Sequence, residues 1–114
     1  MATRRKIACQ PTISPRAGAL NTVYAPDVNR DVLVVASIEI STGAGGSGKV
    51  EALSDSANPP TTVRATIALA TASTDTTGLL VFVCKAGENY KLLTTNVAGT
   101  PTFTLIGNIL EYVF

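Results

Sequence analysis

The glycine-rich segment 43–49, which reads Gly-Ala-Gly-Gly-Ser-Gly-Lys, comes closest to a motif with known chemistry. It satisfies both G-x-G-x-x-G and G-x-x-x-x-G-K, two patterns in which glycines let backbone N–H groups approach a phosphate at the start of a helix. Val50, however, stands where the second pattern needs a Ser or Thr for magnesium, and Pro59 and Pro60 follow too closely for a helix of several turns. The segment therefore predicts a flexible hairpin loop between two antiparallel strands, and we expect no cofactor.

The other reactive side chains also argue against catalysis. The chain has no histidine, which removes Ser-His-Asp and Cys-His nucleophile systems and the commonest metal ligand. Cys9 and Cys84 are too few for a zinc site or a disulfide framework; Cys84 lies in an apolar run and is expected to be a buried thiol, with a Cys9–Cys84 disulfide as the alternative. The acids show no calcium-loop spacing and are expected on strand faces and in turns, with a glycosidase-like carboxylate pair from distant strands as the open alternative. We expect a protein that is not an enzyme and holds no metal.

The composition predicts that part of the surface is covered by other molecules. Charged residues make up 15% of the chain and hydrophobic residues 46%, whereas soluble domains carry about a quarter charged residues. This low charge favours an oligomer or a larger assembly. No stretch reaches the roughly 18 apolar residues of a membrane span, and no apolar segment follows the basic start as in a signal peptide. We expect synthesis in a cytoplasm and no membrane partner.

Residues 1–30 are expected to form an extended N-terminal arm. Prolines, glycines and asparagines interrupt this segment repeatedly, and only residues 19–24 resemble a short strand. Its basic residues precede the first acid, Asp27, so the arm is expected to dock on an acidic protein surface, with nucleic acid as the less favoured partner. The predicted partner-binding residues are Arg4, Arg5, Lys6 and Arg16.

Residues 31–114 are expected to form an all-β body. In residues 32–40, Ile38 and Ile40 alternate with Ser37 and Glu39, so the two pairs are expected on opposite faces of a strand. Residues 79–84 form an uninterrupted apolar run that predicts a buried strand, and residues 96–100 and 107–108 are predicted hairpin turns. The regular spacing of six or seven strands predicts an antiparallel β-sandwich of jelly-roll type. The expected strands are residues 32–40, 49–53, 61–72, 79–84, 90–93 and 109–114.

The C-terminal part carries a resemblance to known proteins. Residues 83–92 read Val-Cys-Lys-Ala-Gly-Glu-Asn-Tyr-Lys-Leu, which is a strand, a short turn around Ala86 and Gly87, and a Tyr-x-Leu strand; the apolar strand 109–114 then closes the chain. This order resembles the C-terminal half of small β-sandwich domains on tailed-phage particles, in fibre tips and capsid decoration proteins. The proline that is usual in that turn is not matched here.

The resemblance implies a structural virion protein that assembles in the cytoplasm of a host bacterium. The favoured expectation is a capsid cement or decoration protein, a homotrimer whose arm binds the major capsid protein or other virion proteins. One alternative is a receptor-binding tip or fibre domain of the phage tail that touches a cell-surface glycan. A carbohydrate-binding module is a further alternative, which the lack of tryptophan disfavours. The loop contacts expected under the fibre-tip alternative are Gly45, Ser47, Lys49, Asn96 and Thr100.

Overall fold

The computed structural model describes residues 11–42, 46–69 and 75–114. Within these ranges the chain forms eight strands and no helix, which confirms the predicted all-β class. Valine, isoleucine and threonine are frequent in the strands, because β-branched side chains suit a pleated backbone. The strands are β1 (Thr12–Arg16), β2 (Val23–Tyr24), β3 (Val32–Ser41), β4 (Ser47–Asp55), β5 (Val63–Leu69), β6 (Thr76–Cys84), β7 (Asn89–Ala98) and β8 (Thr102–Val113).

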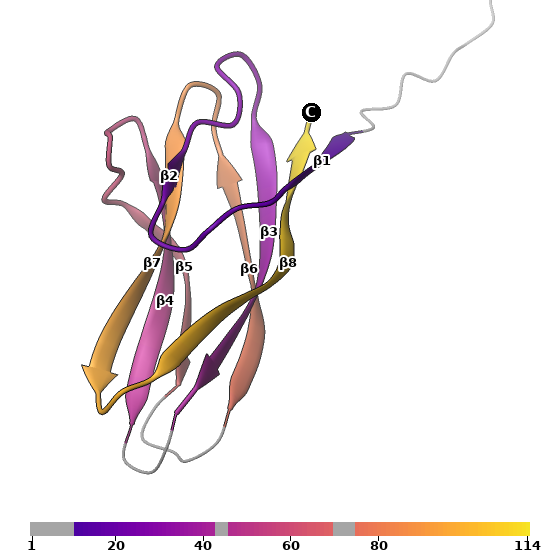
Figure 1. Ribbon diagram of the computed structural model, residues 1–114. Coiled ribbons are helices and arrows are strands. Elements are labelled where there is room, and N and C mark those ends of the chain that lie inside the picture. The colour runs from indigo at the N-terminus through magenta and orange to yellow at the C-terminus, as the bar shows by residue number, and fades with distance from the viewer. Residues whose placement is uncertain (1–10, 43–45, 70–74) are drawn as a thin grey trace, which may run out of the picture.

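The strands form two antiparallel sheets that pack as a sandwich (Figure 1). The first sheet has the order β1-β8-β3-β6 and the second sheet the order β2-β7-β4-β5. Consecutive strands therefore lie in opposite sheets at every step except from β4 to β5. The result is that residues far apart in the sequence, such as those of β1 and β8, become neighbours in the first sheet.

This alternation corrects the three predicted hairpin turns. The segment 43–49 follows β3 of the first sheet and enters β4 of the second, so it links opposite sheets; residues 96–100 do the same between β7 and β8. Residues 107–108 lie inside β8, where the register shifts between the pairs Val35–Leu110 and Ser37–Ile106. That shift is a β-bulge, and turn-forming residues serve a bulge as well as a turn. The local signals were right, but the connections they implied were wrong.

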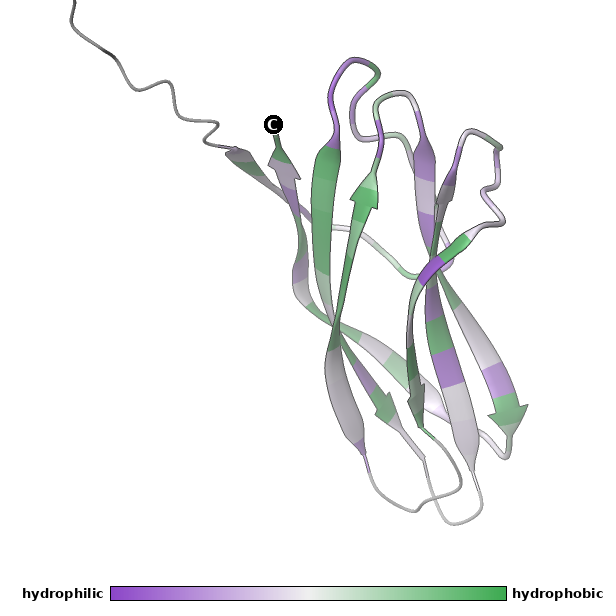
Figure 2. Ribbon diagram, turned by 180° about the vertical axis from the view of Figure 1, so that it is seen from behind, coloured by the Kyte–Doolittle hydropathy of each residue, from purple (hydrophilic) through white to green (hydrophobic). Residues whose placement is uncertain are grey.

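The core lies between the two sheets. Alternate residues of β3 are buried, so Ile38 and Ile40 face inward while Ser37 and Glu39 face outward, as the sequence predicts. Figure 2, which views the molecule from behind, shows the hydrophobic residues along β3 and β6. The second sheet supplies the opposing core layer with Val50, Ala52, Tyr90 and Leu92.

The strand β6 differs from its prediction as a fully buried run. Only Leu80, Phe82 and Cys84 are buried, and the residues between them point outward. Because side chains alternate along a strand, one covered face of a sheet buries only every second residue. The outward apolar residues of β6 therefore need a separate explanation.

The first described residues belong to the sandwich. The strand β1 pairs with β8, and β2 pairs with β7, although both lie in the predicted arm 1–30. The boundary at residue 31 is therefore corrected: the described sandwich includes strands from Thr12 onward. Pro15 indicated a break in the sequence, but β1 is the outermost strand of its sheet, where a missing N–H costs no ladder hydrogen bond. Residues 1–10 lie outside the described ranges.

Candidate interaction surface

The outer face of the first sheet carries an apolar surface at the end where β8 finishes. The strand registers place outward side chains of all four strands in aligned rows. We call the apolar residues of three successive rows, together with Phe114, the apolar face. The rows are Ile13–Tyr112–Leu33–Val83, then Pro15–Leu110–Val35–Val81, then Ile106–Ser37–Leu79.

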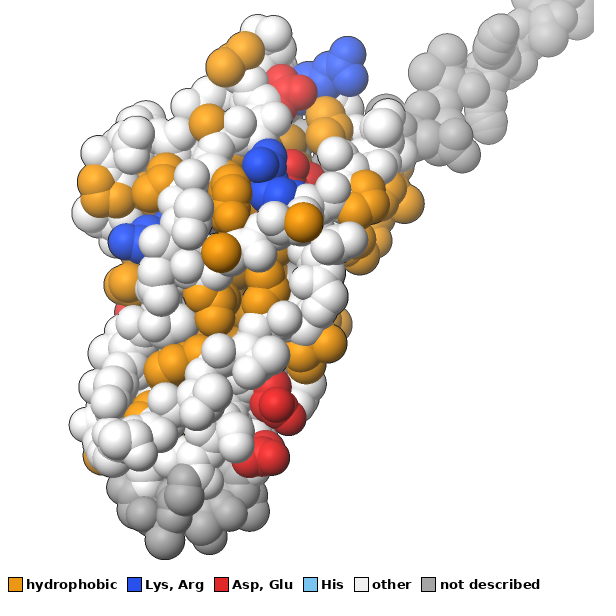
Figure 3. Space-filling model, viewed as in Figure 1, with side chains coloured by type: hydrophobic (Ala, Val, Ile, Leu, Met, Phe, Trp, Pro, Cys, Tyr) orange, Lys and Arg blue, Asp and Glu red, His pale blue; other side chains and the backbone are white. Residues whose placement is uncertain are grey.

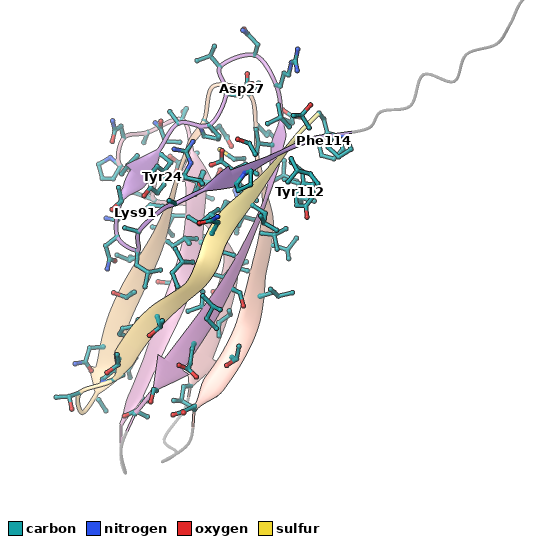
Figure 4. All side chains as sticks on the ribbon, turned by 45° about the vertical axis from the view of Figure 1, so that its right-hand side comes forward. Tyr24, Asp27, Lys91, Tyr112 and Phe114 are labelled. Carbon is teal, nitrogen blue, oxygen red and sulfur yellow. The ribbon has the colours of Figure 1, made fainter. Side chains whose placement is uncertain are left out.

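Many side chains of the apolar face are open to solvent. Leu79 is 62% exposed, Ile13 55% and Val81 49%, which is unusual for large aliphatic residues gathered on one sheet. Hydrophobic side chains gather at the right-hand edge of Figure 3, beside the ends of β1 and β8. Figure 4 shows Tyr112 and Phe114 directed away from the sandwich at the end of β8. A contiguous patch of this kind typically marks an interaction site.

The opposite end of the same outer face is polar. The next row reads Thr104–Glu39–Thr77, and Ser41 beyond it donates a 2.7 Å hydrogen bond from Oγ to Asp75 Oδ1. The change falls between the row that contains Ile106 and the row that contains Thr104, whereas the bulge in β8 lies within the apolar face. The apolar face is therefore confined to one end of the sheet.

The outer face of the second sheet carries charged residues in its rows, with Leu93 and Ala68 among their neighbours. Lys49 lies between Thr95 and Ala68, and Glu51 lies between Leu93 and Thr66. Lys49 Nζ forms an ion pair with Glu51 Oε2 at 3.7 Å. The two outer faces of the sandwich thus differ in kind, and only the first offers an apolar docking surface within the described residues.

A buried acid fixes β1 to the sandwich. Glu111 of β8 is 3% exposed, and its carboxylate accepts hydrogen bonds from Arg16 Nε at 2.7 Å and from the Tyr90 hydroxyl at 2.6 Å. The bond to Glu111 raises the pKa of Arg16, while burial and the same carboxylate raise the pKa of Tyr90. The two sheets are therefore joined by a charged, fully hydrogen-bonded group.

The same cluster holds β2. The guanidinium carbon of Arg16 lies 4.6 Å from the ring centroid of Tyr24, a cation–π contact, and the Tyr24 ring lies 5.5 Å from that of Tyr90. The backbone N–H of Ala19 donates to the Tyr24 hydroxyl at 2.7 Å. These contacts correct the prediction for Arg16, because its charge is used inside the chain and not held free for a partner.

The other predicted contact residues have mixed outcomes. Ser47 is 6% exposed, so it is too buried for a loop contact. Lys49 pairs with Thr95 and Gly48 pairs with Asn96, so the side chains of Lys49 and Asn96 point to opposite faces of the second sheet. Asn96 Nδ2 donates to the Gly99 carbonyl at 2.9 Å. Thr100 is exposed in the adjoining connection. Arg4, Arg5, Lys6 and Gly45 lie outside the described residues.

The remaining reactive groups serve the fold. Cys84 is a free, buried thiol that donates from Sγ to the Glu88 carbonyl at 3.4 Å, and burial raises the pKa of this thiol. Cys9 lies outside the described residues. The strand β4 begins at Ser47, where either phosphate motif requires a helix. No three acidic or cysteine side chains of the described residues gather into a metal site, and no described helix could span a bilayer.

The burial of Glu111 was not predicted, although a signal exists in the sequence. In the apolar segment 109–114, Ile109, Glu111 and Val113 alternate with Leu110 and Tyr112, so the acid shares a face with core residues. A buried carboxylate requires a cationic or hydrogen-bonding partner. Its partner, Arg16, is 95 residues away, and only the pairing of β1 with β8 brings the two together.

Comparison with known proteins places the chain in no group: no family model, curated protein or solved structure matches it.

Proposed function

We propose that this chain is a structural virion protein of a tailed phage, and most specifically a capsid cement or decoration protein without catalytic activity. The observation that carries the proposal is the apolar face, a surface suited to adhesion on a sandwich whose other outer face carries charged residues in its rows. Such a face lowers its free energy by contact with protein, since burial of apolar area is the main favourable term in association. Self-association and attachment to a shell both use this property.

The strand order supports the same class. Sheets ordered β1-β8-β3-β6 and β2-β7-β4-β5 correspond to the arrangement we interpret as a jelly roll, in which two Greek keys fold together. Viral capsid proteins use this architecture, and so do lectins and cupins. The fold therefore fits a virion protein but does not choose the function alone.

The proposed mechanism is adhesion without chemistry. Arg4, Arg5 and Lys6 precede the sandwich and carry the positive charge that an acidic patch on the major capsid protein attracts. A subunit that binds only the assembled shell stabilises that shell by mass action. The protein would assemble in the cytoplasm of the host bacterium and remain in the virion.

Fractionation of purified particles tests this proposal. Heads and tails are separated, and the chain is quantified in each by mass spectrometry. We expect it in the head fraction, at a copy number in proportion to the major capsid protein. Its absence from particles would contradict the virion proposal, and its presence in tails alone would contradict the cement role.

A receptor-binding tip is the second candidate. Asn96 near the end of β7 and Thr100 in the connection that follows β7 are both exposed. Polar groups at one end of a sandwich can contact a glycan, although the described residues there include no exposed tyrosine. Recovery of the chain in the tail fraction would favour this candidate.

A further inference from the structure

We propose that the apolar face binds the same face of a second copy of this chain, and that the two copies are related by a two-fold axis that lies in the plane between the two sheets, perpendicular to their strands. The strands of the two first sheets then run in opposite directions across the contact. This inference rests on the proposed function, because it names the partner of the surface that carries it.

The size of the apolar face suits such a pair. Four strands about 4.8 Å apart and three rows about 6.8 Å apart define a flat area on the order of 400 Å² per copy. Protruding side chains and Phe114, which is 52% exposed, add accessible area to this flat value. Two copies together would bury on the order of 1,000 Å², the lower range of specific interfaces.

The chemistry of the face suits a copy of itself. Ser37 is the single polar residue in the three rows, and no row contains a charge. A charged partner would find no counter-charge there, whereas a second apolar sheet face can pack on it at about 10 Å, as sheets do in a sandwich. An interface formed by the same patch on both subunits is the usual form of a two-fold contact.

The charges around the face decide the orientation. Glu39 lies in the polar row beyond one end of the apolar face. Arg30 and Lys85 are exposed beyond the other end, where the pair Val32–Cys84 closes the ladder between β3 and β6. Asp31 lies there too, with Oδ1 accepting the Ala86 N–H at 2.9 Å.

A two-fold axis in the plane between the sheets, perpendicular to the strands, brings the Glu39 end of each copy to the Arg30 and Lys85 end of the other. An arrangement with parallel strands brings like ends together, and so stacks Glu39 near Glu39. Like charges in contact are unfavourable, and opposite charges fix the register of a pair. The two-fold pair thus replaces the trimer expected from the sequence.

Sedimentation equilibrium or multi-angle light scattering tests the interface. We expect the wild-type chain to have the mass of two chains. Val81→Asp places a charge in the middle row, and we expect its dissociation constant to rise roughly a hundredfold or more, since an unpaired charge would be buried. Thr66→Asp is the matched control, an exposed outward position on the outermost strand of the second sheet, and should leave the mass unchanged.

A charge exchange tests the orientation with variants that keep the apolar face. Glu39→Lys and Lys85→Glu should each raise the dissociation constant roughly two- to fivefold at low salt, the range for exposed ion pairs. The double variant should restore the wild-type value. Additive losses in the double variant would overturn the antiparallel orientation.

The outcomes separate this inference from the proposed function. A wild-type monomer or trimer would overturn the two-fold pair, and presence of the chain in heads would still support the cement role. A stable two-chain species that is absent from particles would support the pair and contradict the virion proposal.

Discussion

At the scale of single residues, we expect the hydrogen bonds of the buried Glu111 carboxylate to contribute strongly to the free energy of unfolding. The carboxylate is buried and bonded to groups from β1 and β7, so it joins three strands of both sheets. Removal of one partner from such a group leaves the others unsatisfied, and this asymmetry makes the site sensitive.

Glu111→Gln should lower the free energy of unfolding by about 2 kcal/mol, the value for hydrogen bonds to a charged group. Arg16 is partly exposed, with a side-chain exposure of 32%, so the loss stays below that of a fully buried pair. Urea unfolding followed by circular dichroism gives the measurement. Glu51→Gln is the matched control, because its ion pair with Lys49 is partly exposed, spans 3.7 Å and contributes at most about 1 kcal/mol. Equal effects in both variants would show that burial of Glu111 has no special weight.

Asp55 is expected to make the free energy of unfolding depend on pH in the acid range. Its carboxylate accepts hydrogen bonds from the backbone N–H groups of Ala57, Thr61 and Thr62 and from the Thr62 hydroxyl. These bonds, led by that from Thr61, hold the pKa of Asp55 well below its ordinary value of 3.8. A lowered pKa in the folded state contributes stability above the ordinary value and loses it as the pH falls toward the folded pKa.

Asp55→Asn should therefore be less stable than wild type at neutral pH, and the difference should shrink as the pH falls below 3.8. Urea titrations at several pH values measure it. Asp75→Asn provides a comparison, since Asp75 accepts a hydrogen bond from Ser41 Oγ. If the difference in free energy of unfolding between wild type and Asp55→Asn stayed constant with pH, the lowered pKa of Asp55 would not explain the loss of stability in acid.

At the scale of elements, the bulge in β8 places a glycine where the backbone leaves the regular strand conformation. Gly107 has a φ of +70°, in the left-handed region that favours glycine, and lies among the extra residues between the pairs to Val35 and Ser37. Ile106 faces outward before the bulge and Ile109 inward after it. Because the bulge inserts two extra residues, even-numbered residues of β8 face outward on both sides of it, and the apolar face continues across it.

Gly107→Ala should destabilise the protein by about 1 kcal/mol, the cost of a left-handed conformation for an ordinary residue. The loss is attributed to the backbone, because a Cβ at this position meets nothing within 4 Å. Gly107→Asn should lose less, since asparagine tolerates this conformation better. Denaturant midpoints of the two variants decide the point, and equal midpoints would contradict it.

The sequence predicted the elements better than their connections. The alternation around Ile38 and the buried Val50 follow from a period of two, which is a local property. The assignment of strands to sheets was missed, since a glycine-rich link looks the same whether it joins neighbours in one sheet or crosses to the other. The apolar face was missed for a related reason: the run 79–84 was read as buried on both sides, whereas the structure leaves every second residue open.

At the scale of the whole molecule, the N-terminal region divides at the start of β1. The notion of a removable arm of residues 1–30 does not hold for β1, because Arg16 bonds Glu111 and Pro15 lies in the apolar face. Only residues 1–10 precede the described sandwich. Truncations should therefore have different effects on either side of this point.

Deletion of residues 2–10 should leave the free energy of unfolding unchanged, while deletion of residues 2–16 should lower it by about 3 kcal/mol, because Glu111 loses its cation and stays buried. Chemical denaturation of the two truncated chains measures both values. Loss of stability in the shorter deletion would mean that residues 2–10 belong to the folded unit.

Binding to particles should distinguish the role of the basic residues in 1–10 from the role of the apolar face. If Arg4, Arg5 and Lys6 anchor the chain on the shell, deletion of residues 2–10 yields a folded protein that binds heads weakly. Reversal of these three charges should weaken binding most at low salt, because exposed charges are screened beyond about 10 Å at 0.1 M salt. Occupancy on heads, measured by cosedimentation across salt concentrations, tests the expectation, with Val81→Asp as the comparison. Since that variant keeps all three basic residues, its occupancy should retain the wild-type salt dependence. Full occupancy by the truncated chain at all salt concentrations would assign the attachment to the sandwich itself.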